Sequence, residues 1–483
     1  MYIMSYITFN PIYILKPNDG STLLLPKELI RENGVVKGGS EFVLHPLHAM
    51  ILNFVNGEDY NETIEKIAIY LKVDKVLVKK FVDILLDNPQ FVKLRGKALP
   101  DSYYLPPMTI ISSDKKRKTI YPPEAFLTDK IDIRHKRHIS PTNLTLMVNN
   151  KCVTDCFYCY ADKRKPIDCS ISLERLEQLI EEACTIGVKN IDVIGGEFFL
   201  YEYWKELLSV LHKNDYYPYL STKVPLDEDI VKTLAELKIK DLQISLDTLV
   251  EEHLSAMLHV KGGYIEKLKK TFLLLNEFHI PLYVHTILTS KNDSVDDMQS
   301  VFNFIKSFDN VKEWKLDVAA PTLYRQYAYD IIKPKEHQVD KIINYLKTIE
   351  KSGCFDIIYP RKLSYTIQEK DKERQFNNRA ICTGNYSNLF ILPDGNVTIC
   401  EELYWHERFI IGNVKKQNLM EVWNSKEAVE LYYLSQKEIP KDSKCSCCAI
   451  YTKCRQGKGI CWKSVIKEFG KDKWYYPDPL CTR

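Results

Sequence analysis

The middle of the chain alternates short apolar stretches with longer stretches in which apolar residues recur every three or four positions. A short apolar stretch is typical of a buried strand, and apolar residues that recur every three or four positions are typical of an amphipathic helix. Six such pairs follow one another between residues 142 and 353, starting with LTLMVN and SLERLEQLIEEACTIG. Regular alternation predicts parallel strands joined by right-handed crossovers. Six units, fewer than the eight of a closed barrel, predict an α/β fold built as a partial (β/α)6 barrel.

The segment NNKCVTDCFYCYADKR comes directly after the first of these strands. The helix that follows has its own start and stop signals, since Ser172 suits an N-cap and Gly187 suits a helix end. Ligands of parallel α/β sheets bind at the carboxyl ends of the strands. We therefore expect Cys152, Cys156 and Cys159 at the ligand-binding end of the barrel.

Residues 1–95 show strands first and helices afterwards. YITFNPIYILK and STLLLP have strand character, HPLHAMILNFVNG predicts a helix ended by Gly57, and helical periods follow in NETIEKIAIYL and KVLVKKFVDILLD. This order predicts a winged-helix-like α+β module, and a generic α+β cap over the next domain fits equally well. Residues 96–141 are rich in proline and charge without a sustained period, which predicts a linker.

The last part of the chain, residues 354–483, is irregular and rich in cysteine, with few segments of helical period. LFILPDGNVTICEE predicts a hairpin that turns at Pro393-Asp394-Gly395-Asn396. A segment with so little regular structure needs support besides an apolar core, and metal clusters would supply it.

Composition narrows the classes of partner. The chain has 483 residues, enough for two to four domains, of which 45% are hydrophobic and 27% are charged. The formal net charge of +3 implies no strong electrostatic attraction to nucleic acid. No apolar run is long enough to cross a bilayer. The first residues lack the basic and apolar regions of a secretory signal. We therefore expect a cytoplasmic protein with neither nucleic-acid nor membrane partners.

Fourteen cysteines need an explanation in a reducing compartment, where disulfides are rare. None precedes Cys152 and eight lie beyond position 381, so metal or iron–sulfur ligation explains them better. The isolated Cys169, Cys184 and Cys354 suit packing roles. In the first cluster, three thiolates would hold three irons of a four-iron cube and leave the fourth iron open. A zinc site completed by a distant residue is the alternative, although no histidine lies near the loop.

The spacing C-x3-C-x2-C, with the aromatic Tyr158 before its last cysteine, resembles the cluster motif of the radical S-adenosylmethionine (SAM) enzymes. The resemblance implies that Cys152, Cys156 and Cys159 hold a [4Fe-4S] cluster whose open iron chelates the amine and carboxylate of SAM. It also implies reductive cleavage of SAM to a 5′-deoxyadenosyl radical that takes a hydrogen from the substrate. These three cysteines are therefore the expected catalytic and metal-ligating residues.

Further matches follow at successive strand ends. GGEFF resembles the family's GGE motif, in which Gly195 and Gly196 allow close backbone approach and Glu197 receives the SAM amino group. YLST, ISLDT and YVHTIL end the next three strands, where the family places polar contacts and a residue that packs on adenine. We expect Ser245 and Asp247 to be exposed together at this rim. The SAM contacts that the resemblance implies are Tyr158, Gly195, Gly196, Glu197, Ser221, Ser245 and Asp247.

One position departs from the family pattern. Related enzymes often carry an arginine after the SLD motif, whereas Leu258 stands at that place here. The usual cation for the SAM carboxylate is then absent or replaced, with Lys223 as the candidate.

The C-terminal cysteines resemble the SPASM extension of radical SAM enzymes, which carries two auxiliary iron–sulfur clusters. The resemblance implies two auxiliary [4Fe-4S] clusters, one on Cys445, Cys448, Cys454 and Cys481 and the other on Cys382, Cys400 and Cys461. Six residues follow Cys454 before the next cysteine, where the family has three, and Cys447 is an extra thiol. A pair of zinc knuckles is the alternative. The second set lacks a fourth cysteine, so its open iron would bind a substrate cysteine thiolate, or water or another residue would close it.

Residues 1–95 resemble, in the order of their elements, the peptide-recognition element fused to maturases of ribosomally made peptides (RiPPs). The whole chain resembles the sactipeptide and ranthipeptide synthases. The resemblance implies a precursor peptide whose leader adds a strand to the sheet edge of this module, and an electron donor such as flavodoxin or ferredoxin. It further implies that the radical takes a hydrogen from the core peptide, a cysteine sulfur closes a thioether and an auxiliary cluster accepts the surplus electron.

Two alternatives stay open on the sequence. The same architecture supports radical carbon–carbon or ether crosslinking, epimerisation, or side-chain oxidation of a peptide or protein. The second alternative is a protein of a different class, a zinc-stabilised adaptor that binds peptides and has no catalytic activity.

Overall fold

The computed structural model describes residues 6–27, 31–32, 35–36, 41–95, 103–161, 166–324, 329–361, 369–403, 406–457 and 459–483. The chain forms two compact units, Met1–Thr142 with Ala183–Asn190 and Asn143–Glu182 with Ile191–Arg483. The start of the N-terminal segment, residues 1–5, and residues 96–102 of the expected linker lie outside the described residues. No helix in the described ranges has the length and apolar character that a membrane span requires.

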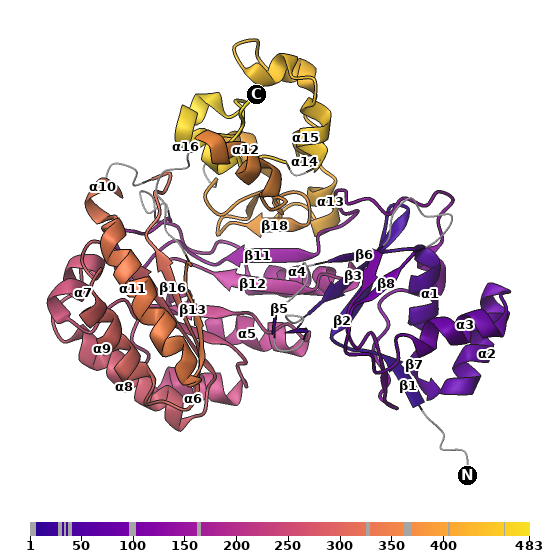
Figure 1. Ribbon diagram of the computed structural model, residues 1–483, viewed down its shortest axis with the longest axis horizontal. Coiled ribbons are helices and arrows are strands. Elements are labelled where there is room, and N and C mark those ends of the chain that lie inside the picture. The colour runs from indigo at the N-terminus through magenta and orange to yellow at the C-terminus, as the bar shows by residue number, and fades with distance from the viewer. Residues whose placement is uncertain are drawn as a thin grey trace. The chain divides into compact units, whose positions relative to one another are not determined.

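In its described residues the first unit combines antiparallel strands with α-helices (Figure 1). Its sheets have the orders β10-β1-β7 and β2-β3-β6, with the small pairs β4-β5 and β8-β9 beside them. The strands are β1 (Tyr6–Phe9), β2 (Tyr13–Asn18), β3 (Ser21–Pro26), β4 (Arg31–Glu32), β5 (Val35–Val36), β6 (Phe42–Leu44), β7 (Asn56–Asp59), β8 (Val92–Leu94), β9 (Tyr103–Leu105) and β10 (Ile110–Ser112). The helices are α1 (Pro46–Phe54), α2 (Tyr60–Leu71) and α3 (Lys75–Asp83).

The expected order of strands followed by three helices is present, with two differences. Helix α1 ends before Gly57, because the chain enters β7 and this glycine, with φ 71°, lies inside that strand. The range predicted as a linker contributes β9 and β10, and β10 pairs with β1. Strands of three residues are too short to produce an alternation that the sequence pattern would reveal.

The second unit contains the predicted alternation of strands and helices. Strands β13 to β17 pair in parallel in chain order, and β11 and β12 are neighbours in a second sheet. The strands are β11 (Asn143–Met147), β12 (Asn190–Ile194), β13 (Leu220–Thr222), β14 (Leu242–Ser245), β15 (Leu282–Leu288), β16 (Val311–Val318) and β17 (Asp356–Ile358). The helices are α4 (Leu173–Thr185), α5 (Trp204–Lys213), α6 (Glu228–Glu236), α7 (Glu251–Leu258), α8 (Tyr264–Glu277), α9 (Val295–Ile305), α10 (Tyr329–Ile332) and α11 (Glu336–Ile349).

The strand and helix boundaries follow their local signals. Ser172 Oγ accepts a hydrogen bond from Arg175 N at 3.2 Å, as an N-cap of α4 does, and Gly187 has the positive φ of a helix end. Strand β17 lies past residue 353 and adds a seventh parallel strand to the six that the pattern predicts.

The β13–β17 sheet has one apolar and one polar face, because successive strand residues point to opposite sides. Ile244, Val284 and Trp314 are at most 1% exposed, and Phe302 of α9 stacks on Trp314. Helices α6 to α9 and α11 cover this apolar side (Figure 1). Partly exposed residues alternate with the apolar ones and form what we call the polar face, made of Ser221, Gln243, Ser245, Tyr283, His285, Glu313, Lys315 and Asp317.

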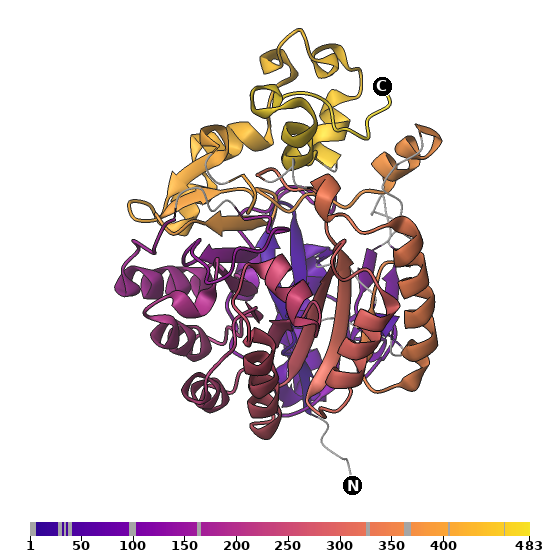
Figure 2. The same cartoon turned by 90° about the vertical axis from the view of Figure 1, so that its left-hand side faces the viewer.

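The C-terminal part of the second unit is built on the first barrel strand. β18 (Asn388–Ile391) and β19 (Asn396–Thr398) form the predicted hairpin, and Gly395 in its turn has φ 88°. Strand β18 also pairs in parallel with β11, and β20 (Ile410–Asn413) extends the sheet beyond β19. Both ribbon views show the yellow C-terminal segments on the β18 side of β11 (Figures 1 and 2).

The expectation of few helices in this part is wrong. The described residues of this part contain five helices of five to ten residues, namely α12 (Glu369–Asn378), α13 (Leu419–Trp423), α14 (Lys426–Tyr432), α15 (Tyr451–Gly457) and α16 (Trp462–Phe469). Helices of one to three turns contain too few apolar positions to establish a period.

Candidate active site

The cysteine loop follows β11 and is fastened to the end of α7. Backbone N–H groups of Asp155 and Phe157 donate to the carbonyls of Leu258 and Met257 at 2.9 and 3.0 Å. Leu258, the residue at the place of the family's arginine, is fully buried and holds the loop through its carbonyl. This backbone contact does not depend on which side chain stands at position 258, and the leucine side chain itself is buried.

One hydroxyl lies between two thiols of the loop. Thr154 Oγ1 is 3.2 Å from Cys152 Sγ and 3.3 Å from Cys156 Sγ. Cys159 N donates to the carbonyl of Cys156 at 3.0 Å, which closes the loop into a turn. The three predicted thiols therefore lie on one compact, backbone-ordered segment.

The glycine motif ends β12 at a close backbone crossing. Gly196 N donates to Asn149 O at 2.9 Å, and a Cβ added to Gly196 would lie 2.0 Å from the carbonyl oxygen of Lys151. No residue with a side chain fits at that distance. The glycine is therefore needed for contact between this strand end and the start of the cysteine loop.

Glu197 is a buried carboxylate beside this crossing. Its Oε2 accepts from Thr222 Oγ1 at 2.8 Å and its Oε1 accepts from Phe199 N at 3.3 Å. Burial raises the pKa of Glu197 to about 7, although these hydrogen bonds oppose the rise. A cation bound beside it would favour the ionised form, so this carboxylate is suited to receiving an ammonium group.

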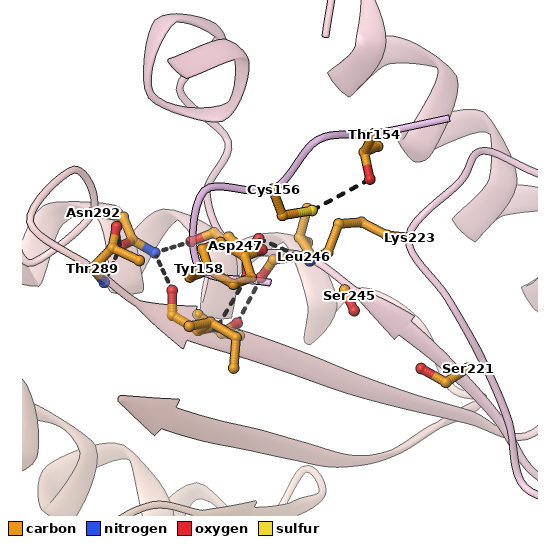
Figure 3. A network of polar contacts seen from close by, with 12 residues as sticks. Thr154, Cys156, Tyr158, Ser221, Lys223, Ser245, Leu246, Asp247, Thr289 and Asn292 are labelled. Carbon is orange, nitrogen blue, oxygen red and sulfur yellow. Dashed lines mark hydrogen bonds and ion pairs between the residues drawn. The ribbon is translucent and has the colours of Figure 1, made fainter. Parts of the chain in front are cut away.

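Asp247 organises the centre of the site (Figure 3). Its Oδ2 accepts from the hydroxyl of Tyr158 and lies 2.9 Å from Lys223 Nζ. The other carboxylate oxygen accepts from the backbone N–H of Ile287 at 2.9 Å. Asp247 is only 1% exposed, so the expectation that it stands exposed at the rim with Ser245 is wrong. It is buried because it anchors groups from three segments.

Burial and neighbouring charges act in opposite directions on the pKa values of Lys223 and Cys156. Burial lowers the pKa of Lys223, but the neighbouring Asp247, Cys156 and Cys159 outweigh it and raise the pKa overall. Burial raises the pKa of the Cys156 thiol, and Lys223 opposes that rise. The candidate cation for the SAM carboxylate is thus an ammonium paired with Asp247 at the edge of the cysteine loop.

The structure separates the two predicted serines from this centre. Gln243 Nε2 donates to Ser221 Oγ at 3.0 Å and to Ser245 Oγ at 3.3 Å, so both serines lie on the polar face. Figure 3 shows them apart from the cluster around Asp247. The hydroxyl that reaches Glu197 belongs to Thr222, the neighbour of Ser221 on the opposite side of β13.

The four cysteines predicted for one auxiliary cluster share a single cavity. This cavity of about 370 Å³ is lined by Cys445, Cys448, Cys454 and Cys481. Arg455 Nη2 lies 3.8 Å from Cys445 Sγ, and Arg379 Nη2 lies 3.8 Å from Cys454 Sγ. Cys447 is exposed and is not among the lining residues, so it stands outside the set.

The other predicted set is less tightly gathered. Cys382 lines a neighbouring cavity of about 550 Å³, whereas Cys400 and Cys461 are not among its lining residues. Burial raises the pKa of the Cys382 thiol, and the nearby Cys461 raises it further. Burial also raises the pKa of Cys400, to about 12, and Cys382 contributes to this rise. Among the described residues that line this cavity, no second thiol, histidine or carboxylate stands with Cys382.

The donor atoms gathered in these sets are thiol sulfurs, which suit iron–sulfur clusters. In the described part of the chain, no three His, Cys, Asp or Glu side chains converge tightly enough to hold one ion. A mononuclear zinc site requires thiolates only ~3.8 Å apart, since each Zn–S bond is ~2.3 Å. An iron–sulfur cube holds its thiolates at separate corners and tolerates a wider spread.

Comparisons with known proteins identify the family of this chain. A model of the radical SAM superfamily matches residues 146–305. The sporulation killing factor maturation protein SkfB of Bacillus subtilis is 32% identical over 300 residues, which are 60% of this chain and 67% of SkfB. The chain belongs to the radical SAM superfamily. A model of the SPASM iron–sulfur cluster-binding domain matches residues 382–449 of this radical SAM enzyme.

Solved structures share its fold. SuiB of Streptococcus suis bound to SAM superposes with a TM-score of 0.64 at 14% identity and covers 99% of this chain and 100% of SuiB. SuiB bound to the precursor peptide SuiA gives the same TM-score at 16% identity and the same coverage.

Among the relatives by sequence, a probable GTP 3′,8-cyclase of Thermococcus kodakarensis is 21% identical over 54% of this chain and 84% of its own length.

As a radical SAM enzyme with a SPASM domain, the chain uses SAM, a [4Fe-4S] cluster and auxiliary iron–sulfur clusters. The donor sets found here, made of thiols only, fit that requirement. The ligand assigned to each iron remains a prediction.

The sequence pattern did not identify several residues that hold the site together. Asn149 Nδ2 donates to Glu197 O at 3.0 Å, and Asn292 Nδ2 donates to Asp247 O at 2.8 Å. Asn149 stands two positions after the end of β11, as Asp247 does after the end of β14, and this shared position could have indicated it. Asn292 lies in a loop without any pattern, and only the fold brings it to Asp247.

Proposed function

We propose that this radical SAM enzyme modifies a ribosomally made precursor peptide by joining a cysteine sulfur to a peptide carbon in a thioether. The observation that carries the proposal is the 32% identity with SkfB, a maturation protein, over two thirds of SkfB. The SuiB fold extends over almost the whole chain, and SuiB was solved with a precursor peptide. A chain with this architecture is suited to a peptide substrate.

In this proposal Cys152, Cys156 and Cys159 hold the cluster that binds SAM. When bound, the cluster and SAM supply the electron transfer and the radical that removes hydrogen from the substrate. Gly196 keeps the strand end free of side chain where the cofactor approaches the backbone. Glu197 accepts the SAM ammonium, whose charge lowers the raised pKa of this carboxylate and keeps it ionised.

The Asp247 cluster positions the loop in this proposal. Tyr158 donates to Asp247 from between the second and third cysteines, so the carboxylate limits rotation of the loop. Lys223 neutralises negative charge that accumulates at the thiolates. Ser221 and Ser245, on the polar face, are assigned to the substrate side of the pocket.

The auxiliary clusters and the first unit complete the proposal. Cys445, Cys448, Cys454 and Cys481 hold one cluster, and Cys382, Cys400 and Cys461 hold the other. Residues 1–95 bind the leader, since β2 and β6 are the outer strands of their sheet and offer backbone groups to an added strand. A flavodoxin or ferredoxin supplies electrons, which suits a cytoplasmic enzyme with reduced thiols.

Co-expression with the peptide encoded beside the gene for this chain tests the proposal. Mass spectrometry should find a loss of two hydrogens per crosslink, and each crosslink should remove one thiol from reaction with iodoacetamide. The triple variant Cys152→Ala, Cys156→Ala, Cys159→Ala is the control and should leave the peptide unchanged. An unchanged mass with the wild-type enzyme contradicts the proposal, while a modified peptide of unchanged mass indicates epimerisation. Loss of two hydrogens with all thiols still reactive indicates a crosslink of another type.

A further inference from the structure

A charged cluster occupies the polar face next to the site described above. In the strand register His285 of β15 stands opposite Lys315 of β16, and Asp317 follows two positions later. His285 Nε2 lies 3.0 Å from Asp317 Oδ2, and Lys315 Nζ lies 2.8 Å from the same oxygen. The His285 side chain is 21% exposed, so the imidazole is largely shielded but still reachable.

Stability does not account for this cluster. The strands are already held by the apolar face, where Val284, Trp314 and Leu316 are at most 1% exposed. Ion pairs between half-exposed groups contribute little to stability, because water screens their charges. Lys315 and Asp317 are 45% and 43% exposed. A functional role explains better why three ionisable groups face the inside of the barrel.

The carboxylate determines the state of the imidazole. Asp317 is ionised, because hydrogen bonds from His285 and Lys315 lower its pKa to about 2. An ionised carboxylate only accepts, so it holds the His285 proton on Nε2. Nδ1 makes no hydrogen bond to any residue in the described ranges. A carboxylate that orients an imidazole in this way leaves the other ring nitrogen as a proton acceptor.

His285 lies on β15, the strand next to the one that leads to Asp247, and Lys315 and Asp317 lie one strand further on. Ile287, two residues after His285, donates its N–H to Asp247 and stands opposite Asp317 in the register. Neighbouring strands are about 4.8 Å apart. A substrate that reaches the cysteine loop from inside the barrel therefore passes beside His285.

We propose that His285, oriented by Asp317, is the base that removes the thiol proton of the substrate cysteine during thioether formation. This inference rests on the proposed function. A C–H and an S–H bond break and one C–S bond forms. The hydrogen atom goes to the SAM-derived radical and gives 5′-deoxyadenosine, the thiol proton goes to His285 Nδ1, and the remaining electron goes to an auxiliary iron–sulfur cluster.

Chemical rescue tests this role on the reconstituted full-length enzyme. The substrate is the synthetic form of the cysteine-containing peptide encoded beside the gene. His285→Ala should lower the crosslinking rate at least ~100-fold, the range that general bases contribute. Deoxyadenosine formation and the affinity for fluorescein-labelled peptide should stay within about threefold. Added imidazole should restore crosslinking to His285→Ala but not accelerate the wild-type enzyme.

Two further variants separate this role from a structural one. Asp317→Asn should lower crosslinking without abolishing deoxyadenosine formation, since it removes the charge that orients the imidazole. Lys312→Gln, which removes an exposed charge from the same strand β16, should behave as wild type. Unchanged crosslinking in His285→Ala would overturn the inference, as would a parallel loss of deoxyadenosine or a failure of imidazole to restore the rate. If the wild-type enzyme forms no thioether, the proposed function itself fails, which is a distinct result.

Discussion

At the residue scale, the site depends on a few positions whose contacts connect several segments. Asp247 connects Tyr158, Lys223 and the backbone of Ile287, so one buried carboxylate orders three segments. Gly196 is the other such position, because its missing side chain permits the close crossing with Lys151. Both residues were predicted to contact SAM, and the structure adds that they also hold the protein part of the site together.

Gly196→Ala should weaken SAM binding at least ~10-fold, because the new Cβ would lie 2.0 Å from a backbone carbonyl and force the loop to move. Gly262→Ala is the matched control, since a Cβ there meets nothing within 4 Å. Equilibrium dialysis of the reconstituted enzyme with labelled SAM measures the effect. Equal affinities for the two variants would show that the crossing does not shape the SAM site.

Arg455 provides a second prediction at this scale. It is 8% exposed and lines both cysteine cavities, and its Nη1 has no hydrogen-bond partner among the described residues. A guanidinium 3.8 Å from Cys445 Sγ stabilises added negative charge on a cluster held there. The reduced cluster carries the added negative charge and is stabilised more than the oxidised cluster, so Arg455 should raise the reduction potential of this cluster.

Arg455→Gln should therefore lower the midpoint potential of the cluster assigned to Cys445, Cys448, Cys454 and Cys481. A shift of roughly tens of millivolts is expected, since a tenfold change corresponds to about 59 mV for one electron. Arg408→Gln, which removes a guanidinium stacked on Trp474, is the control. Redox titration followed by electron paramagnetic resonance reports the potentials, and no difference between the two variants would count against the assignment.

At the element scale, short strands and helix ends are fastened by polar groups that no period reveals. Lys16 of β2 is 1% exposed and donates from Nζ to Pro141 O at 2.5 Å and to Gly187 O at 3.4 Å. Burial lowers the pKa of Lys16 to about 7. The first unit thus contains an ammonium whose charge is costly in the folded state.

The sign of the resulting pH dependence follows from linkage. Between pH 7 and the ordinary lysine pKa of 10.5, the unfolded chain binds the Lys16 proton more strongly than the folded one. The free energy of unfolding should therefore rise with pH across this window and fall as pH drops toward 7, by up to about 1.4 kcal/mol per pH unit.

Lys16→Met should remove this slope, whereas Lys116→Met, at an exposed position, should keep it. Urea unfolding at several pH values between 7.5 and 10, followed by circular dichroism, gives the comparison. Parallel slopes in the two variants would mean that Lys16 does not titrate in this window.

At the scale of the whole molecule, cysteine placement divides the second unit into three expected cluster sites. Four thiols line one cavity, while the adjacent Cys447 is exposed outside it. Neighbouring residues thus have opposite expected roles, which provides a test within one short segment.

Cys448→Ala should lower the iron content from about twelve to about eight per chain, because one of three four-iron clusters loses a ligand. Cys447→Ala should keep about twelve. Anaerobic iron and sulfide analysis of the purified chains measures both. Zinc in place of iron, or equal losses in both variants, would contradict the assignment of this cavity.

The predictions from sequence succeeded where the signal was local. The helix α4 caps and the hairpin at Gly395 depend on neighbouring residues, and the structure confirms them. The comparisons confirm the family that the cysteine spacing indicated. Elements of three to five residues, such as β10 and α13, were missed because they are shorter than any detectable period.

By itself the sequence determined the barrel and the cysteine loop, because alternation and thiol spacing are properties of contiguous residues. Only the tertiary structure decided that Asp247 is buried, that β18 joins β11, and that His285 meets Asp317. The physical reason is strand register. Residues 32 or more positions apart become neighbours only when parallel strands align, and that alignment depends on which strands pair and how their apolar faces pack, which no single contiguous stretch of sequence specifies.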